Sequence, residues 1–328
     1  MPRFTRKWSV LVCMIFIFAS LTAATAEEKI DFRSFDPQDY RDILTGKFKD
    51  HTVGIHGFLY LPEGAGGKVP VVIIVPGSGG IKHWMQSTIG KPLNDAGMAS
   101  FVIDSFSGRS VTETASDQTK VSMPASVIDG FTALKALEKH PAIDISRAGI
   151  TGFSRGGITA MFTTEKRLKD VVLGPSIGFT AHAPIYPGCS TQWRSPKPTS
   201  ASILFLLGGA DDFTPARKCV DYSKRMKDHG AEANYIVYPG AHHAWMADFP
   251  VRQINAFQFA DCELYVENDG VIVNEKTGVT TKQGWKAFVL DAVRTCAKRG
   301  PHVGENPEMR KKAVNDLVSF FRKAFRMQ

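Results

Sequence analysis

The 328-residue sequence lacks several features that would direct it to a particular class of protein. It has no cluster of basic residues, although its formal net charge is +8, because lysines and arginines alternate with acidic residues along the chain. Taking away the charges of Arg3, Arg6 and Lys7 near the N-terminus leaves +5. A nucleic-acid partner is therefore not expected. Internal repeats and low-complexity tracts are absent as well.

Motifs for metal ions and nucleotide cofactors are also missing. His242, His243 and Asp248 lie close together, but there is no His-Glu-x-x-His motif and no cysteine–histidine spacing suited to zinc. Gly77-Ser78-Gly79 follows an apolar run, yet the dinucleotide fingerprint G-x-G-x-x-G needs a glycine at position 82, where the sequence has Lys82. We therefore expect no metal and no cofactor, and the sequence argues against a nucleotide-binding oxidoreductase.

Long apolar runs are scarce, and the one near the N-terminus has the features of a secretory signal peptide. Three positive charges precede an apolar run of about 12 residues, and Ala24-Thr25-Ala26 supplies a small-residue cleavage site. The run is short for a bilayer span, so an uncleaved membrane anchor is the alternative. We predict a signal peptide over residues 1–26, export to the periplasm or the medium, and no membrane attachment after cleavage.

Cysteine is infrequent, with five residues in the whole chain. One of them lies in the predicted signal peptide, which leaves an even number in the exported protein. An even count in an exported chain is typical of disulfide bonding. We favour pairing Cys189 with Cys219 and Cys262 with Cys296, because the members of each pair are close in sequence. Four unpaired buried cysteines are the alternative.

Apolar runs alternate with helical patterns along the remaining residues. The expected strands are 52–61, 69–75, 99–104, 147–153, 202–207 and 235–238, and the expected helices lie near 84–96, 128–137, 154–162, 215–229 and from 307 onward. The first strand is predicted to lie at an antiparallel edge, and those at 69–75, 99–104 and 202–207 to be buried. This alternation favours the α/β class, with a mostly parallel sheet covered by helices on both faces. We expect one domain over 27–328, with a disulfide-pinned insertion at about 249–304 before the C-terminal helix.

The chain is organised around Gly152-Phe153-Ser154-Arg155-Gly156, a G-x-S-x-G pattern between a predicted strand and a predicted helix. In that context the pattern predicts a nucleophile elbow, a tight turn that lifts the serine oxygen above the sheet. The glycines allow chain segments to approach where a Cβ atom would clash. The helix that follows directs its N-terminal amides toward negative charge that develops beside Ser154.

Two acidic residues and two histidines follow later strands. Asp211 and Asp212 come after the strand at 202–207, and His242 and His243 after the strand at 235–238. Ligands of open α/β sheets bind at the carboxyl ends of the strands. The order serine, acid, histidine is that of the α/β-hydrolase triad, in which a base activates the serine and a carboxylate orients the base. Spacing alone does not choose between the members of each doublet.

Further residues are candidates for roles around the serine. The backbone amides of Arg155 and of Ser78, with Gly79 as the neighbouring option, are expected to stabilise an oxyanion. Gly79, Arg109 and Trp245 are candidate substrate contacts, Arg109 for an acidic group and Trp245 for the acyl chain. A solvated loop position is the alternative for Arg109, and core packing is the alternative for Trp245. Thr214-Pro215 predicts an N-cap and a first-turn proline for the helix that follows.

Three segments together resemble the dienelactone hydrolase family of α/β hydrolases. They are Gly-Phe-Ser-Arg-Gly-Gly at 152–157, Gly-Gly-Ala-Asp-Asp-Phe-Thr-Pro at 208–215 and Tyr-Pro-Gly-Ala-His-His-Ala-Trp at 238–245. The resemblance covers roughly residues 50–328 and implies the α/β-hydrolase fold. It also implies that the catalytic acid is Asp211 and the histidine His243. The founding members of the family use cysteine as nucleophile, and the serine at 154 implies a serine esterase instead.

These features predict a serine hydrolase that cleaves a small carboxylic ester or lactone through a Ser-His-Asp triad and an acyl-enzyme intermediate. One alternative is a non-catalytic exported protein that binds a ligand on the same fold. Another is an acyl hydrolase that acts on thioester or peptide bonds. The only partner we expect is the small-molecule substrate, and the sequence indicates no particular oligomeric state.

Overall fold

The computed structural model describes Met1 and residues 27–328, so the predicted signal peptide lies outside the described residues except for its first methionine. A central sheet has the strand order β1-β2-β4-β3-β5-β6-β8-β9. The six strands β4, β3, β5, β6, β8 and β9 run parallel to one another. β2 is antiparallel to its neighbours β1 and β4. The strands are β1 Glu27–Phe35, β2 Thr52–Tyr60, β3 Val69–Val75, β4 Ala99–Asp104, β5 Ile143–Phe153, β6 Ala181–Ile185, β8 Ser202–Gly208 and β9 Glu232–Tyr238.

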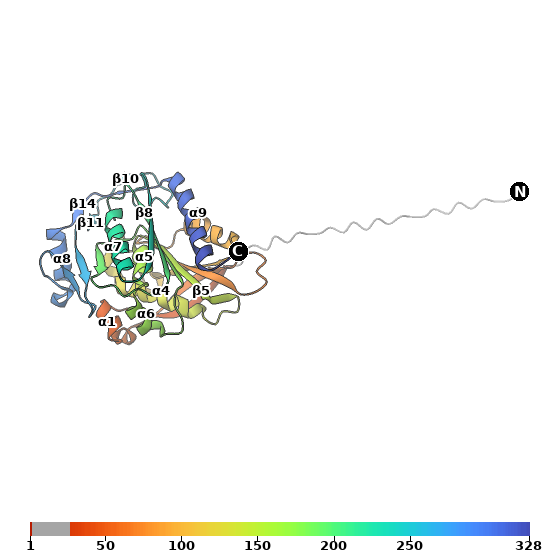
Figure 1. Ribbon diagram of the computed structural model, residues 1–328, viewed down its shortest axis with the longest axis horizontal. Coiled ribbons are helices and arrows are strands. Elements are labelled where there is room, and N and C mark those ends of the chain that lie inside the picture. Colours follow the sequence, from red (N-terminus) through yellow and green to blue (C-terminus); the bar gives the residue numbers. More distant parts are fainter. Residues whose placement is uncertain (2–26) are drawn as a thin grey trace.

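Helices cover both faces of this sheet, as the sequence predicted (Figure 1). They are α1 Tyr40–Leu44, α2 His83–Met85, α3 Lys91–Asp95, α4 Met123–Leu137, α5 Arg155–Phe162, α6 Lys166–Leu173, α7 Ala216–Asp228, α8 Trp285–Thr295 and α9 Pro307–Ala324. Alternate residues of β3 enter two separate cores. Ile73 belongs to a core that includes side chains of α4 to α7, and Ile74 belongs to a core that includes side chains of α3 and α9. No helix in the described part of the chain is long and apolar enough to cross a bilayer.

One close approach shows why a core strand carries a glycine. A Cβ atom on Gly149 of β5 would lie 2.4 Å from the ring of Phe321, which comes from α9. The missing side chain lets that aromatic ring lie directly on the sheet, where it is fully buried. Gly149 therefore allows the C-terminal helix to cover the sheet beside the strand that carries the elbow.

Two strands correct the sequence-based prediction. β2 does pair antiparallel, but it is not the edge strand, because β1 pairs with it along its entire length, from Glu27 opposite Tyr60 to Phe35 opposite Thr52. β1 was not expected because its apolar residues are few and only half-buried. β6 was also missed: it is short and contains His182 and Pro184, although all five residues are buried between β5 and β8.

The segment between β9 and α9 adds short strands and one helix. β10 Arg252–Gln253 pairs with β15 His302–Val303, and β11 Phe257–Gln258 pairs with β14 Lys298–Arg299. β12 Leu264–Val266 lies between β13 Ile272–Asn274 and β7 Thr191–Trp193. Because β7 precedes β8 in the chain, this small three-stranded sheet attaches the segment to the main body.

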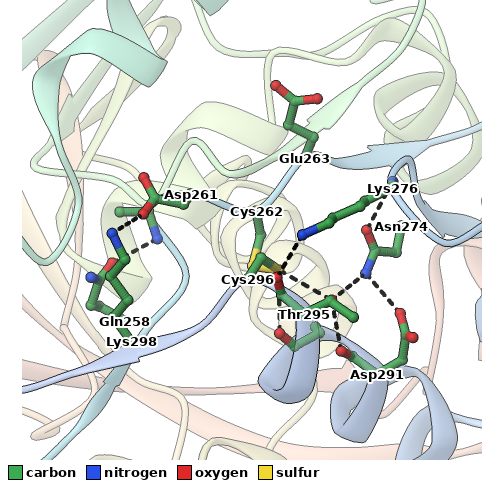
Figure 2. The surroundings of a disulfide bond; sticks show 12 residues. Gln258, Asp261, Cys262, Glu263, Asn274, Lys276, Asp291, Thr295, Cys296 and Lys298 are labelled. Carbon is green, nitrogen blue, oxygen red and sulfur yellow. Dashed lines mark hydrogen bonds and ion pairs between the residues drawn. A yellow bond between two sulfur atoms is a disulfide. The ribbon is translucent and has the colours of Figure 1, made fainter.

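Two disulfides have the pairing that sequence proximity favoured. Cys189 bonds to Cys219, with their Cα atoms 5.1 Å apart, and Cys262 bonds to Cys296, with theirs 5.0 Å apart. Figure 2 shows the second bond beside the end of α8. Next to it Asn274 donates to Asp291 at 2.7 Å, so that β13 and α8 are joined on the same side. The disulfide thus links two positions within the segment between β9 and α9, one before β12 and one at the end of α8.

Candidate active site

Ser154 occupies a strained turn between β5 and α5. Its φ of 54° and ψ of −110° are unusual for a residue with a side chain. A Cβ atom on Gly152 would lie 2.4 Å from the carbonyl oxygen of Gly156, and one on Gly156 would lie 2.1 Å from that of Val75. The amide of Ser154 donates to the carbonyl oxygen of Ile185 at 3.0 Å. The turn has the geometry expected of a nucleophile elbow.

A hydrogen-bonded chain leads from Ser154 to a buried acid. The Oγ atom of Ser154 lies 2.9 Å from Nε2 of His243, and Nδ1 of His243 lies 2.9 Å from Oδ2 of Asp211. Asp211 follows β8, and His243 follows β9. Both side chains are at most 5% exposed, whereas Ser154 is half-buried and accessible. An imidazole held in this way can accept the serine proton.

Thr214 bonds to Asp211 through both its amide and its hydroxyl, a role that the sequence did not predict. Oδ1 of Asp211 accepts hydrogen bonds from the amides of Phe213 and Thr214, at 2.9 and 2.7 Å. The Thr214 hydroxyl lies 2.9 Å from Oδ2 of Asp211 and 3.0 Å from Nδ1 of His243. Thr214 does not cap α7, whose N-cap is Pro215 without a side-chain bond, so that prediction is wrong. A Thr-Pro sequence is typical of a helix N-cap. The position of the Thr214 hydroxyl beside Asp211 and His243 can be seen only in the folded chain.

The second member of each doublet lies elsewhere. Asp212 accepts hydrogen bonds from the amide and from Nδ1 of His302, both at 2.8 Å. Partial burial works to raise the pKa of Asp212, but the hydrogen bonds from His302 outweigh it and hold the pKa below its ordinary value. The ring of His242 lies 5.7 Å from that of His302. Geometry therefore brings Asp211 and His243 to the serine and directs Asp212 toward β15.

Two aromatic rings flank the imidazole of His243. Tyr186 lies edge-on at 4.9 Å between ring centroids, and Phe213 lies tilted at 4.8 Å. Tyr186 is buried, and burial raises the pKa of its hydroxyl well above the ordinary value. Phe213 is half-exposed. Neither was predicted, because Tyr186 follows the missed strand β6 and Phe213 has no motif beyond its place in the acid loop.

The expected amide donors lie on two segments that meet at Ser154. Arg155 is the first residue of α5. The loop after β3 packs against the elbow, since a Cβ atom on Gly77 would lie 3.1 Å from the carbonyl oxygen of Phe153 and 3.8 Å from Cβ of Ser154. Ser78 follows in this loop, and its carbonyl oxygen accepts a 2.7 Å hydrogen bond from the amide of Thr114. Gly79 is partly accessible in the same loop.

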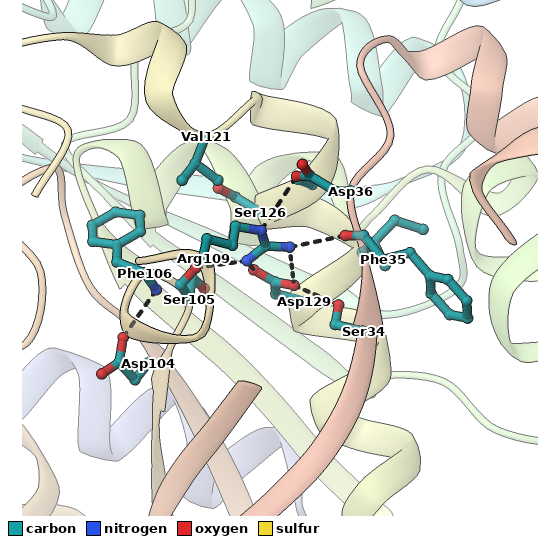
Figure 3. Close-up of polar contacts among 12 residues, drawn as sticks. Ser34, Phe35, Asp36, Asp104, Ser105, Phe106, Arg109, Val121, Ser126 and Asp129 are labelled. Carbon is teal, nitrogen blue, oxygen red and sulfur yellow. Dashed lines mark hydrogen bonds and ion pairs between the residues drawn. The ribbon is translucent and has the colours of Figure 1, made fainter. Parts of the chain in front are cut away.

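Arg109 is not available to a substrate, which corrects the sequence-based expectation (Figure 3). Its guanidinium bonds to both carboxylate oxygens of Asp129, at 2.8 and 3.0 Å, and its Nε to Asp36 at 3.2 Å. The carbonyl oxygens of Ser105 and Phe35 accept its remaining hydrogen bonds. The Arg109 side chain is 6% exposed and that of Asp129 is completely buried. Arg109 therefore joins the N-terminal strand to α4.

Replacing Arg109 with alanine is expected to lower the free energy of unfolding by about 3–5 kcal/mol, because Asp129 would remain buried without its partner. The control is Arg194→Ala. Arg194 also bonds to two carboxylates, those of Glu267 and Glu275, but its side chain is 38% exposed. A surface pair of this kind contributes about 1 kcal/mol or less. Equal losses for the two variants in urea unfolding would contradict the structural role given to Arg109.

Trp245 is a second correction, because it packs in the core and does not line an acyl pocket. Its side chain is fully buried. It lies edge-on to Tyr186 at 4.6 Å between ring centroids and 5.6 Å from the ring of Tyr238. Tyr186 also contacts His243, so Trp245 packs against a residue that packs against the histidine. Core packing, which was the alternative prediction for Trp245, is therefore correct.

Comparison with known proteins shows which family the chain belongs to. Residues 55–265, more than half of the chain, match the model described as "Dienelactone hydrolase family". A protein from Bradyrhizobium sp., named a probable 2-oxo-3-(5-oxofuran-2-ylidene)propanoate lactonase, is 27% identical over 200 residues, which cover 56% of this chain and 76% of that protein.

Solved structures of similar proteins include a putative dienelactone hydrolase from Klebsiella pneumoniae and a thermophilic esterase from Thermogutta terrifontis with propionate bound. The first is 18% identical, covers 67% of this chain and 89% of its own, and has a TM-score of 0.47. The second is 14% identical, covers 58% and 80%, and has a TM-score of 0.45. The match of residues 55–265 to the family model, which covers the elbow and the loops that carry Asp211 and His243, decides the assignment. The chain belongs to the dienelactone hydrolase family, a family of hydrolases.

Proposed function

We propose that this hydrolase cleaves small carboxylic esters or lactones with Ser154 as nucleophile, His243 as general base and Asp211 as the acid that orients the base. The observation that carries the proposal is the hydrogen-bonded chain through these three residues, with both distances at 2.9 Å, at a strained strand-to-helix turn. The name of the Bradyrhizobium relative, a lactonase, supports a lactone or related ester as the substrate class.

The reaction proceeds in two steps. His243 accepts the hydroxyl proton as Oγ of Ser154 attacks the carbonyl carbon, and the amides of Arg155 and Ser78 stabilise the oxyanion. The carbon–oxygen bond to the leaving group breaks as His243 returns the proton to that oxygen, leaving an acyl-serine ester. Water then attacks the acyl group with His243 again as base, and the acid product leaves as Ser154 regains its proton.

The proposed place of this activity is outside the cytosol. We propose that residues 1–26 are removed and that the remaining chain acts outside the cytosol. The basic, apolar and small-residue pattern of the N-terminus supports this, and so do the two disulfides, because such bonds persist in oxidising compartments.

The proposal is tested by labelling the protein lacking residues 1–26 with a fluorophosphonate and mapping the adduct by peptide mass spectrometry. An activated serine reacts, so we expect one adduct per chain, on Ser154, and none after heat denaturation. Unlabelled protein is then assayed against esters, lactones, thioesters and peptides with matched acyl groups, because the adduct itself blocks Ser154. Absence of an adduct on folded protein would contradict the proposal and favour a ligand-binding role.

A further inference from the structure

Gln118 lies between the two residues whose amides are the proposed oxyanion donors. Its Oε1 accepts a hydrogen bond from the guanidinium of Arg155 at 2.9 Å. Its Nε2 donates to Oγ of Ser78 at 2.9 Å, and the same Oγ lies 3.2 Å from Oε1. Gln118 is far from both in sequence, and it belongs to an exposed segment between β4 and α4. One side-chain amide therefore joins the elbow helix to the loop after β3.

The orientation of this amide follows from its partners. A guanidinium can only donate hydrogen bonds, so the oxygen of the Gln118 side chain must face Arg155. The nitrogen then faces Ser78, whose hydroxyl can accept. Each end of the amide thus has a partner that matches it, and the reversed orientation would place two donors against each other.

Arg155 is held by neutral acceptors. Its side chain bonds to Gln118 and to the carbonyl oxygen of Val121, and among the described residues no carboxylate lies within ion-pair distance of it. Arg109, by contrast, is neutralised by Asp129 and Asp36. Burial lowers the pKa of Arg155 to about 10, so it still carries its positive charge at neutral pH. That charge lies on the residue directly after the serine.

The loop that carries Ser78 is rich in glycine. It contains Gly77, Gly79 and Gly80, and within it the amide of Gly80 donates to the carbonyl oxygen of Gly77 at 3.0 Å. Glycine-rich loops lose much conformational entropy when they are ordered. The Gln118 side chain and the amide of Thr114 attach Ser78 to the segment between β4 and α4.

We propose that Gln118 is a positioning residue for the oxyanion site, which couples the guanidinium of Arg155 to Ser78 and fixes the loop that presents the second amide donor. The inference rests on the proposed acyl-transfer function. A donor that is misplaced by a fraction of an ångström loses much of its effect in the transition state, while it contributes little to binding of the ground state. Gln118 therefore acts on kcat more than on KM.

The test compares Gln118→Ala and Gln118→Glu with Thr119→Ala as matched control. Thr119 is the exposed neighbour, and its hydroxyl donates to Asp117 in the same segment at 2.6 Å. Removing a direct oxyanion donor lowers kcat by roughly 10²–10³, so we expect Gln118→Ala, which misplaces one, to lower kcat by about 10–50-fold. KM should stay within about twofold, and affinity for a trifluoromethyl ketone, which forms a tetrahedral adduct, should fall in parallel with kcat.

Gln118→Glu separates positioning from simple stabilisation. A carboxylate at 118 forms an ion pair with Arg155, so thermal stability should equal or exceed that of the wild type. The same carboxylate cannot donate to Ser78, although the Ser78 hydroxyl can still donate to it, as it can to Oε1 of Gln118 at 3.2 Å. Its negative charge opposes the oxyanion, so kcat should fall below that of the wild type although the fold is not weakened. A residue with only a structural role would lose activity and stability together.

Two results would overturn the inference. One is a kcat of Gln118→Ala within twofold of the wild type while Ser154→Ala is inactive, which would leave the proposed function standing and remove the role of Gln118. The other is an equal loss of kcat in Thr119→Ala, which would show a general effect of the segment. Activity that persists in Ser154→Ala would instead contradict the proposed function itself.

Discussion

Ester hydrolysis by Ser154→Ala is expected to fall by on the order of 10⁴–10⁶ in kcat, because the variant removes the atom that forms the acyl-enzyme. His243 and Asp211 remain in place, but the base then has no hydroxyl to activate. The amides at the start of α5 can still polarise a carbonyl group, which accounts for any residual rate over water. The measurement is turnover of the ester or lactone that the substrate panel identifies.

The fold should be unaffected by this change. Alanine keeps the Cβ atom, so the strain at φ 54° is the same in both proteins, and the midpoint of thermal unfolding should shift little. Ser110→Ala is the matched control. Ser110 is another serine with positive φ, 56°, but it is exposed, lies at the end of a short turn and is in none of the hydrogen bonds that join Ser154, His243 and Asp211. Turnover by Ser154→Ala above about one thousandth of the wild-type rate would argue against a serine nucleophile.

The parts of the site that could be predicted are those that depend on local sequence. G-x-S-x-G between an apolar run and a helical pattern fixes Ser154 at an elbow, because the close approaches of Gly152 and Gly156 leave no room for other residues. The ends of β8 and β9 follow from their apolar runs, so the acid and histidine doublets could be placed at one edge of the sheet. The two disulfides followed from proximity along the chain.

The parts that could not be predicted depend on contacts between distant segments. Arg109 sits in a polar loop sequence, and only the folded chain brings it to Asp129 and to the end of β1. Gln118 has no motif, and its proposed role follows from contacts with Arg155 of α5 and with Ser78 of the loop after β3. Trp245 follows the histidine doublet closely, yet the turn after β9 directs its ring inward.

The choice within the acid doublet leads to the second large effect. Asp211→Asn is expected to lower kcat by about 10⁴, while Asp212→Asn should stay within about threefold of the wild type. Asp212 is a suitable control because it is the adjacent residue, undergoes the same chemical change and also bonds to a histidine, His302. That pair is 43–47% exposed, so its loss should change stability by about 1 kcal/mol or less.

The reason for the difference lies in the hydrogen atoms that asparagine adds. At position 211 the amide oxygen would keep the bonds from Phe213 and Thr214, and its NH₂ would take the place of Oδ2 facing Nδ1 of His243. Nδ1 must then accept, which moves the imidazole proton to Nε2, the atom that faces the serine. A protonated Nε2 cannot accept the hydroxyl proton, so the geometry survives while the base is lost. Equal losses from the two asparagine variants, or a larger loss from Asp212→Asn, would mean that Asp211 does not orient the base.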